Sequence, residues 1–193
     1  MEKSNIDEKI KLLTGSGMWH TQEVKGLPSV HLSDGPHGLR KQEEKERQNN
    51  VSLVSTCYPT ASALACSWDV TAAERLGRAV AKEAWNADVA VLLGPGINMK
   101  RSPLCGRNFE YFSEDPFLAG RLGAAYVSAA QGENVAVSLK HFAANNQETN
   151  RQTSNSQIDE RALREIYLSA FEYVVKTARP ATVMASYNRL NGY

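Results

Sequence analysis

Hydrophobic residues recur every three or four positions in several stretches of the chain. This spacing places the apolar side chains on one face of a helix and predicts amphipathic helices. The stretches are residues 69–84, 116–131 and 159–178, with a shorter one at residues 7–13. We therefore expect at least three long helices that pack through their apolar faces.

Capping residues indicate where the long helices begin. Asp115 precedes a proline, a pair that is typical of an N-cap followed by the first helical residue. Thr71 with Glu74, and Ser156 with Asp159, have the three-residue spacing of a capping box. Each of the three helices is thus expected to start at one of these signals.

Short apolar runs separate the predicted helices and predict β-strands. They lie at residues 29–33, 89–93, 135–139 and 182–186. The run at 89–93 is apolar without alternation, which is typical of a strand buried on both faces. A fifth segment, Thr60–Cys66, fits either a short buried strand or a helical turn, because periodicity alone does not separate the two.

Strands that alternate with amphipathic helices imply parallel βαβ units with right-handed crossovers. Two architectures fit, a (β/α)8 barrel and an open doubly wound sheet. The segments after the strands are long and polar and the returns are short, as in a barrel whose site lies at the strand C-termini. The five candidate strands fall short of a barrel's eight. The predicted fold class is therefore α/β, the N-terminal portion of a (β/α)8 TIM-type barrel, with residues 1–193 as one domain incomplete at its C-terminus.

The composition argues against several classes of binding partner and structural site. The 193 residues are 42 % hydrophobic and 22 % charged, with a formal net charge of +1, which argues against a nucleic-acid-binding surface. The apolar runs are too short to cross a membrane, and the charged start lacks the apolar core of a signal peptide, so we expect a cytoplasmic protein. Three cysteines without CxxC spacing indicate neither a disulfide framework nor a zinc site. Residues 41–50 contain no apolar side chain and are expected to form an exposed loop.

Polar and charged residues gather directly after the predicted strands. Because the C-terminal ends of parallel strands meet at one barrel mouth, we expect these side chains to converge. Charged and amide groups without a phosphate-binding glycine motif suit a ligand with many hydroxyl groups, since each hydroxyl both donates and accepts. The residues are Asp34, His37, Arg107, Glu110, Lys140, His141, Asn145, Asn146, Glu148, Arg151, Tyr187 and Asn188.

Six motifs follow one another along the chain. They are SDGPHGLR (33–40), YPTASALACSWD (58–69), GPGINMKRSPLCGRNFEYFSEDP (94–116), SLKHFAANNQETNRQ (138–152), DERALREIYLSAFE (159–172) and VMASYNRLNG (183–192). In this order they resemble glycoside hydrolase family 3, and in particular its bacterial β-glucosidases. The resemblance implies an N-terminal barrel followed by an α/β sandwich domain, and hydrolysis of β-glycosides with retention.

The resemblance also implies a substrate-binding role for six residues of this chain. Asp34 would bind the distal hydroxyls of the terminal sugar, and Arg107, Lys140 and His141 would bind the same ring. Arg151 and Tyr187 would complete the pocket beside the nucleophile. The family pattern implies no metal and no cofactor.

Each of these residues also has an ordinary structural explanation. Asp34 precedes Gly-Pro and suits a turn. Arg107 could belong to a surface ion network with Glu110, Glu114 or Asp115, and Lys140 could form a salt bridge at the strand edge. His141 and Tyr187 could be core residues, and Arg151 could lie in a solvated loop.

A retaining glycosidase needs two carboxyl groups about 5–5.5 Å apart, one as the nucleophile and one as the acid/base. The family's nucleophilic Asp lies in a strand after the segment that matches residues 187–192, and its acid/base Glu lies in the sandwich domain. Both are therefore expected beyond Tyr193, and no catalytic residue is assigned in this chain. Asp34 and Glu148 are rejected as the pair on the same ground.

The sequence predicts the N-terminal substrate-binding part of a retaining, exo-acting β-glucosidase that acts on terminal non-reducing β-D-glucosyl residues. The isolated chain is expected to be inactive. The alternatives are a non-catalytic carbohydrate-binding or regulatory barrel fragment and a β-xylosidase of the same family. Related xylosidases tend to carry Glu at the position of Asp34, so Asp34 favours a hexose. The expected partners are a small β-glucoside or oligosaccharide and further domains of the same polypeptide, with no nucleic acid and no membrane.

Overall fold

The computed structural model describes residues 6–42 and 51–193. Within these residues, four parallel strands form one sheet in the order β1-β2-β3-β5. The strands are β1 (Leu32–Asp34), β2 (Val91–Leu93), β3 (Ala136–Phe142) and β5 (Thr182–Ala185). Their order in the sheet follows their order along the chain, so every crossover moves the chain in the same direction, as in a barrel.

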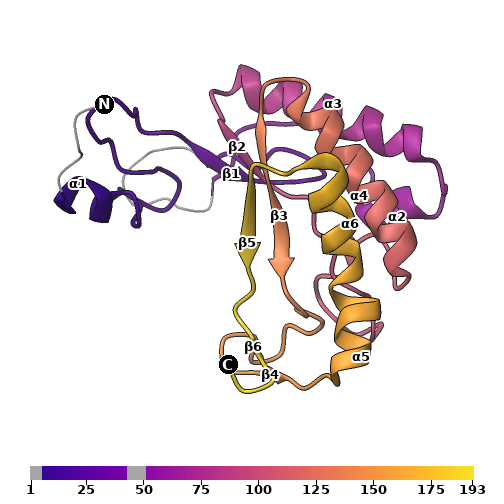
Figure 1. Cartoon of the computed structure of the whole chain (residues 1–193). Helices are drawn as coiled ribbons and strands as arrows, with labels where there is room; N and C mark the ends of the chain where they lie inside the picture. Colours follow the sequence, from indigo (N-terminus) through magenta and orange to yellow (C-terminus); the bar gives the residue numbers. More distant parts are fainter. Residues whose placement is uncertain (1–5, 43–50) are drawn as a thin grey trace.

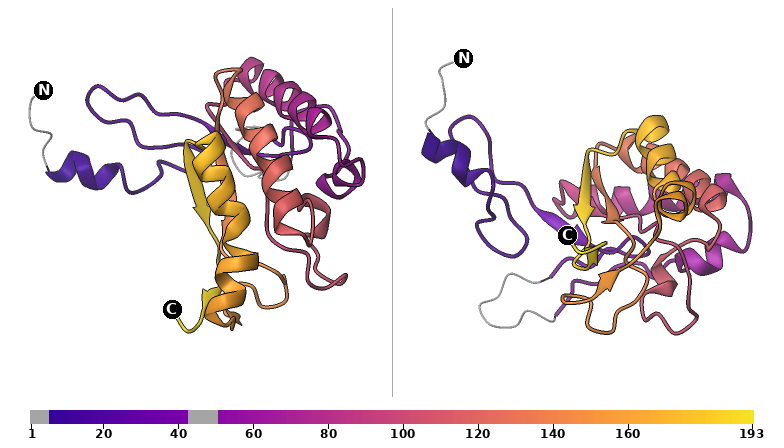
Figure 2. Two further views of the ribbon diagram at one scale, coloured as in Figure 1. Left: turned by 45° about the vertical axis from the view of Figure 1, so that its right-hand side comes forward. Right: turned by 60° about the horizontal axis from the view of Figure 1, so that its bottom comes forward.

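Helices α3 (Val70–Asn86), α4 (Pro116–Gln131) and α6 (Ser169–Ala178) cover one face of this sheet. They lie side by side, with α4 packed between α3 and α6 (Figures 1 and 2). A doubly wound sheet carries helices on both faces, whereas these three share one face. The structure thus confirms the prediction of an N-terminal portion of a (β/α)8 barrel.

The hydrophobic core lies between the three helices and the sheet. An added Cβ at Gly77 in α3 would lie 2.5 Å from the Tyr126 carbonyl oxygen, so glycine lets α3 approach α4 closely. The largest fully buried core side chains from the strands and helices include Leu92, Val137, Leu139, Val80, Leu122, Tyr126 and Val127.

The prediction that the strand at 89–93 is buried on both faces is wrong for this chain. Strand β2 is shorter than predicted, and only Leu92 in it is fully buried, on the side of the helices. Val91 and Leu93 point to the other face and are half-buried. That face would be the interior of a complete barrel, and the described residues do not close over it.

Two of the three predicted helix starts require correction. Helix α3 begins after Asp69, whose carboxylate accepts a hydrogen bond from Thr71 N at 2.8 Å, so Thr71 is not the capping residue. Asp159 caps α5 (Glu160–Ala162) itself, while the Ser156 hydroxyl donates to the Ala144 carbonyl. In both cases an aspartate near the predicted start provides the N-cap.

Helix α4 begins where it was predicted. The Asp115 carboxylate accepts hydrogen bonds from Phe117 N at 3.3 Å and Leu118 N at 2.9 Å, and Pro116 is the first helical residue. This capping satisfies backbone donors that have no partner within the helix.

The remaining elements lie around this framework. Thr60–Cys66 contains helix α2 (Ala61–Ala65), which decides between the two predicted alternatives. The predicted helix at 159–178 is divided into α5, the π-helical turn η2 (Leu163–Tyr167) and α6. Helix α1 (Ile6–Lys11) projects away from the sheet with the N-terminal segment (Figure 1). The other short elements are η1 (Asn108–Glu110) and a parallel pair of strands, β4 (Asn155–Ser156) and β6 (Arg189–Leu190).

Two further predictions concern the polar parts of the chain. The predicted loop at 41–50 falls mostly on residues 43–50, which lie outside the described residues. Among the residues that are described, no helix is long and apolar enough to cross a membrane.

Candidate functional site

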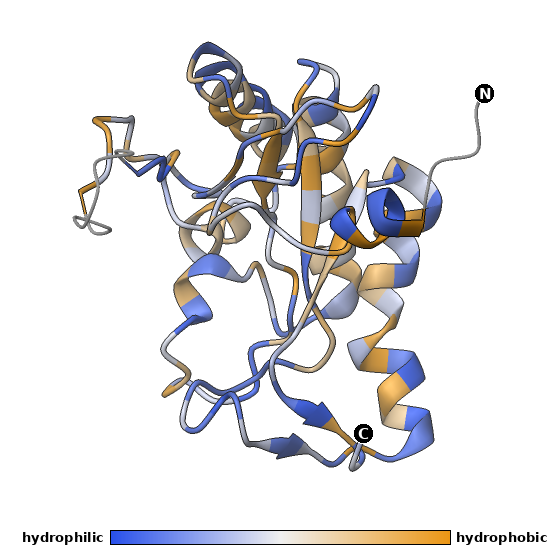
Figure 3. Ribbon diagram, turned by 90° about the vertical axis from the view of Figure 1, so that its left-hand side faces the viewer, coloured by the Kyte–Doolittle hydropathy of each residue, from blue (hydrophilic) through white to orange (hydrophobic). Residues whose placement is uncertain are grey.

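The predicted site residues lie at or just beyond the C-terminal ends of the strands. Asp34 ends β1, and Lys140 and His141 belong to β3, which runs to Phe142 rather than ending at Leu139 as predicted. Figure 3 shows hydrophobic colouring along the strands and mostly hydrophilic colouring in the loops beyond them. Ion pairs between residues at or after the C-terminal ends of β1, β2 and β3 show that polar side chains meet at this edge.

The turn after β1 holds Asp34 in place. Gly35 has φ +113°, and an added Cβ there would lie 2.0 Å from the Gly38 carbonyl oxygen, so the turn requires glycine. The backbone oxygen of Asp34 accepts from Arg40 N at 2.9 Å. The Asp34 carboxylate points toward the cluster instead of closing the turn, and it remains 33 % exposed.

Lys140 is a buried cation with two acidic partners. Its side chain is 3 % exposed, and its Nζ lies 3.2 Å from Glu110 Oε2 and 3.8 Å from Asp34 Oδ1. A buried charge is tolerated only when it is paired in this way. Between Leu139 and Phe142 the register of β3 against β5 shifts, and this is where both Lys140 and His141 turn toward the site.

The charges continue in alternating sign beyond Glu110. Arg107 Nε donates to Glu110 Oε1 and lies 3.8 Å from Glu148 Oε1, and Arg151 Nη1 donates to Glu148 Oε2 at 2.9 Å. Burial alone would lower the pKa of Arg107, but Glu110 and the other nearby acidic groups raise it above its usual value. We call the sequence of ion pairs Asp34–Lys140–Glu110–Arg107–Glu148–Arg151 the charge chain; it holds three acids and three bases.

His141 lies beside the charge chain and is fixed through both backbone and ring. Its backbone N–H donates to Asn98 Oδ1 at 2.8 Å, and Asn98 Nδ2 donates to its carbonyl oxygen at 2.9 Å. The ring Nδ1 lies 2.9 Å from the hydroxyl of Tyr111. Burial, with the cations Arg107, Lys140 and Arg151, lowers the pKa of His141 to about 2, so the imidazole is neutral at physiological pH.

Tyr187 stands at the outer end of the charge chain. The Arg151 guanidinium carbon lies 5.1 Å from the centre of the Tyr187 ring, a cation–π contact. The Tyr187 side chain is largely exposed, so it is not a core residue. With it, the structure brings all six predicted binding residues into one connected cluster.

Some structural alternatives are thereby decided. The alternative is right that Arg107 pairs with Glu110, but the pair is mostly buried rather than part of a surface network. The second acidic partner of Arg107 is Glu148, not Glu114 or Asp115. The alternative that Lys140 forms a salt bridge is also correct, because Lys140 pairs with Glu110. This pair does not exclude a ligand that binds next to Lys140.

Three further residues organise the cluster. Glu110 is among the residues expected at the barrel mouth but has no predicted binding role, yet it links two cations; its position three residues after Arg107 is the available signal. Asn98 and Tyr111 had no signal, since their partner His141 is more than twenty residues away along the chain. Asn188, in contrast, was a candidate but donates to the Ala143 carbonyl and holds the loop.

His37 lies next to the charge chain in the turn after β1. Both of its ring nitrogens are buried, and neither has a hydrogen-bond partner among the described residues. Burial lowers its pKa to about 4, an effect that Glu110 opposes and Lys140 reinforces. The His37 imidazole is therefore neutral at physiological pH.

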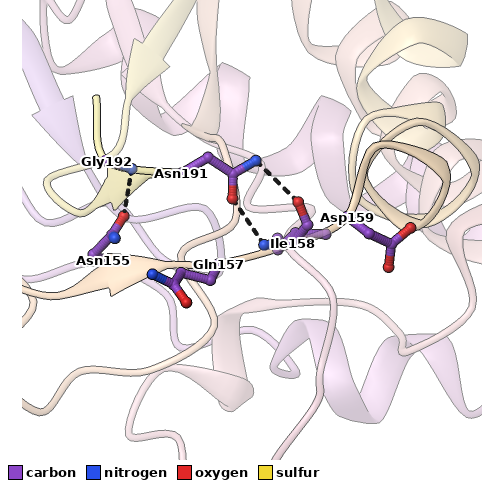
Figure 4. A pocket seen from close by; sticks show the side chains of 6 residues that line it. All are labelled: Asn155, Gln157, Ile158, Asp159, Asn191 and Gly192. Carbon is purple, nitrogen blue, oxygen red and sulfur yellow. Dashed lines mark hydrogen bonds between the residues drawn. The ribbon is translucent and has the colours of Figure 1, made fainter.

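Another pocket lies beside the paired strands β4 and β6 and is lined by residues 155, 157–159, 191 and 192 (Figure 4). Its lining groups are occupied by the chain itself: Asn191 accepts from Ile158 N at 2.8 Å and donates to Ile158 O at 2.9 Å. Gly192 N donates to Asn155 Oδ1 at 2.9 Å. These contacts hold the two loops together.

Nowhere in residues 6–42 and 51–193 do three or more His, Cys, Asp or Glu side chains gather as a metal site would require.

Comparison with known proteins places this chain in a family. The family described as glycosyl hydrolase family 3 N terminal domain matches residues 36–193. The chain is 52 % identical to thermostable beta-glucosidase B of Acetivibrio thermocellus, over 100 % of this chain and 26 % of that protein. It is 50 % identical to an exo-alpha-(1->6)-L-arabinopyranosidase of Bifidobacterium longum, over 97 % of this chain and 25 % of that protein.

A solved structure shows the same fold. The beta-glucosidase of Kluyveromyces marxianus in complex with glucose superimposes with a TM-score of 0.92 at 44 % identity, over 98 % of this chain and 22 % of that one. The chain thus spans about a quarter of the length of the relatives it matches. Since the family match covers most of the chain, this protein belongs to the glycosyl hydrolase family 3 N-terminal domain family.

Proposed function

We propose that this chain is the N-terminal substrate-binding part of a retaining, exo-acting β-glucosidase that hydrolyses terminal non-reducing β-D-glucosyl residues. Relatives over the whole chain bear the name beta-glucosidase, and one similar structure is described as a complex with glucose. The proposal concerns the whole protein, of which this chain is about a quarter by comparison with its relatives.

The charge chain is the observation that carries the proposal. Its buried end holds Lys140 and Glu110 rigidly, while the Asp34 carboxylate is one third exposed and free to accept hydrogen bonds. In the proposed complex Asp34 accepts from the distal hydroxyls of the terminal glucose. Lys140, Arg107 and the neutral His141 donate to hydroxyls of the same ring, and Arg151 with Tyr187 borders the pocket.

The charge balance of the cluster suits a neutral ligand. Each of the three carboxylates is already paired with Lys or Arg. An anionic ligand would compete with these carboxylates, whereas a sugar hydroxyl can donate to one partner of a pair and accept from the other. A polyhydroxyl ligand therefore fits without breaking the ion pairs.

The catalytic carboxyl groups are proposed to lie in the part of the protein after Tyr193. A general acid needs a carboxyl group in an apolar setting that favours its protonated form. Asp34, Glu110 and Glu148 each face a cation instead. Their proposed task is to bind and orient the sugar, not to act as the general acid.

The test uses the full-length protein and p-nitrophenyl β-D-glucopyranoside. Asp34→Ala removes contacts that strengthen in the transition state and supply several kcal/mol, so kcat/KM should fall about 100-fold or more. Glu74→Ala, at an exposed position of α3, is the matched control and should leave turnover unchanged. Turnover of Asp34→Ala within twofold of the wild type would refute the assignment of Asp34.

The Bifidobacterium relative supports a second candidate, an exo-α-L-arabinopyranosidase. An L-arabinopyranoside is a pentoside that lacks the exocyclic hydroxymethyl group of glucose. Comparing kcat/KM for p-nitrophenyl α-L-arabinopyranoside and the β-glucoside separates the two. Retained glucose binding without turnover of either substrate would instead favour the non-catalytic alternative.

A further inference from the structure

Tyr111 and Asn145 form a buried hydrogen-bond relay behind His141. Tyr111 is 0 % exposed, and its hydroxyl lies 2.9 Å from both His141 Nδ1 and Asn145 Nδ2. Asn145 Nδ2 also donates to Glu148 Oε1 at 3.3 Å, which ties the relay to the charge chain. The relay approaches His141 from the side of Nδ1.

The relay determines which ring nitrogen carries the proton. The amide of Asn145 donates to the Tyr111 oxygen, because its nitrogen also faces the Glu148 carboxylate, which only accepts. The Tyr111 proton then has His141 Nδ1 as its acceptor. If Nδ1 were protonated, the Tyr111 O–H would be left buried without an acceptor among the described residues, which is unfavourable.

The other ring nitrogen remains available. No hydrogen bond within the described part of the chain uses His141 Nε2. The charged groups that face the ring are Arg107, Lys140 and Arg151, and their charges, together with burial, disfavour a second proton on it. The ring thus has one N–H, at Nε2, and no positive charge.

We propose that Tyr111 and Asn145 are positioning residues that hold His141 as the Nε2-protonated neutral tautomer, so that it donates one hydrogen bond to a sugar hydroxyl. The tautomer follows from the contacts alone, whereas its use toward a sugar rests on the proposed function. The two parts therefore need separate measurements, one without substrate and one with it.

The first measurement is solid-state ¹⁵N NMR of the full-length protein with labelled histidine, assigned by comparison with His141→Gln. The wild type should show a protonated Nε2 and an unprotonated Nδ1 for His141. Tyr111→Phe should shift the Nδ1 resonance, since Nδ1 loses its donor. Tyr126→Phe is the control: Tyr126 is equally buried but donates to the Pro36 carbonyl, so the His141 signals should not move. A protonated Nδ1 in the wild type, or an unmoved signal in Tyr111→Phe, would overturn the proposal.

A second variant keeps the test valid should Tyr111→Phe fail to fold. Asn145→Asp replaces a donor by an acceptor, so the Tyr111 hydroxyl should donate to the new carboxylate and accept from His141. The His141 proton should then move from Nε2 to Nδ1. A proton that stays on Nε2 in this variant would contradict the relay.

The second measurement is kinetic. Tyr111→Phe should lower kcat/KM for the p-nitrophenyl glycoside by about tenfold, the effect of one weakened hydrogen bond. In a His141→Gln background the same change should have little effect, because Tyr111 acts through His141. An equal loss in both backgrounds would overturn the positioning role. Absence of glycosidase activity in the wild type would reject the proposed function but leave the NMR result to judge the tautomer.

Discussion

Replacing Glu110 by Gln removes the carboxylate that lies between Lys140 and Arg107. The Lys140 Nζ is 3.2 Å from Glu110 Oε2, and the two side chains are 3 % and 6 % exposed. At an effective dielectric constant of about 20, two unit charges at this distance attract by about 5 kcal/mol. The variant relieves the desolvation of Glu110 itself, so the net loss is smaller than the sum of its two ion pairs. We expect Glu110→Gln to lower the free energy of unfolding by about 3–5 kcal/mol, the usual range when one partner of a buried pair is removed.

Glu133→Gln provides a control at the same distance. Glu133 Oε1 also lies 3.2 Å from its partner, Arg78 Nη1, but the Arg78 side chain is 53 % exposed. Solvent screens this pair, and its loss should lower the free energy of unfolding by at most about 1 kcal/mol. The comparison therefore isolates burial from distance.

The assay is urea denaturation of the full-length protein, fitted to the transition that includes the barrel domain. Repeating it at high salt should leave the effect of Glu110→Gln unchanged and weaken that of Glu133→Gln further. Equal losses for the two variants, within about 0.5 kcal/mol, would refute the argument that burial makes the charge chain strong.

Three other predictions concern pH, capping and the open edge of the sheet. Burial lowers the pKa of His37 to about 4, so the unfolded chain binds a proton near pH 6.5 that the folded chain excludes. The free energy of unfolding should thus fall as the pH drops from about 6.5 to 4. His37→Asn should reduce the slope of this free energy against pH by the equivalent of about one bound proton, and an unchanged slope would contradict the lowered pKa of His37. Asp115→Ala should lower the free energy of unfolding by about 1 kcal/mol through loss of the α4 N-cap, and an equal loss in the control Glu114→Ala would contradict this. Phe142 and Val183 are about half exposed in an apolar groove at the β5 edge, so the isolated chain should bind a hydrophobic dye and self-associate. It should also hydrolyse no p-nitrophenyl glucoside, because the catalytic carboxyl groups are proposed to lie after Tyr193. A monodisperse or active fragment would contradict that expectation.

Helix α4 shows what local sequence determines. Asp115, Pro116 and Gly132 each act within one turn of the helix end, so the bounds can be predicted without knowledge of the fold. The segment at 60–66 starts with one capping residue, Thr60, but its short side chains fit either a helix or a buried strand. Its helical form becomes clear only in the structure, where the Thr60 hydroxyl accepts from Ala63 N.

The end of β3 shows the opposite case. Lys140 and His141 are polar and are therefore expected in a loop, yet both are buried in the strand. They are tolerated there because Glu110 and Tyr111 arrive from the loop after β2 and satisfy their charge and hydrogen-bonding groups. Such compensation involves segments that are distant in sequence, and the pattern of one strand cannot indicate it.

The charge chain at the strand C-termini is proposed to bind the terminal sugar. A crystal structure of the full-length protein soaked with glucose would show whether it does. We predict glucose hydroxyls within hydrogen-bond distance of the Asp34 carboxylate, Lys140 Nζ and His141 Nε2, with the Lys140–Glu110 ion pair intact. Glucose bound elsewhere, with these three groups out of reach of the sugar, would contradict the account.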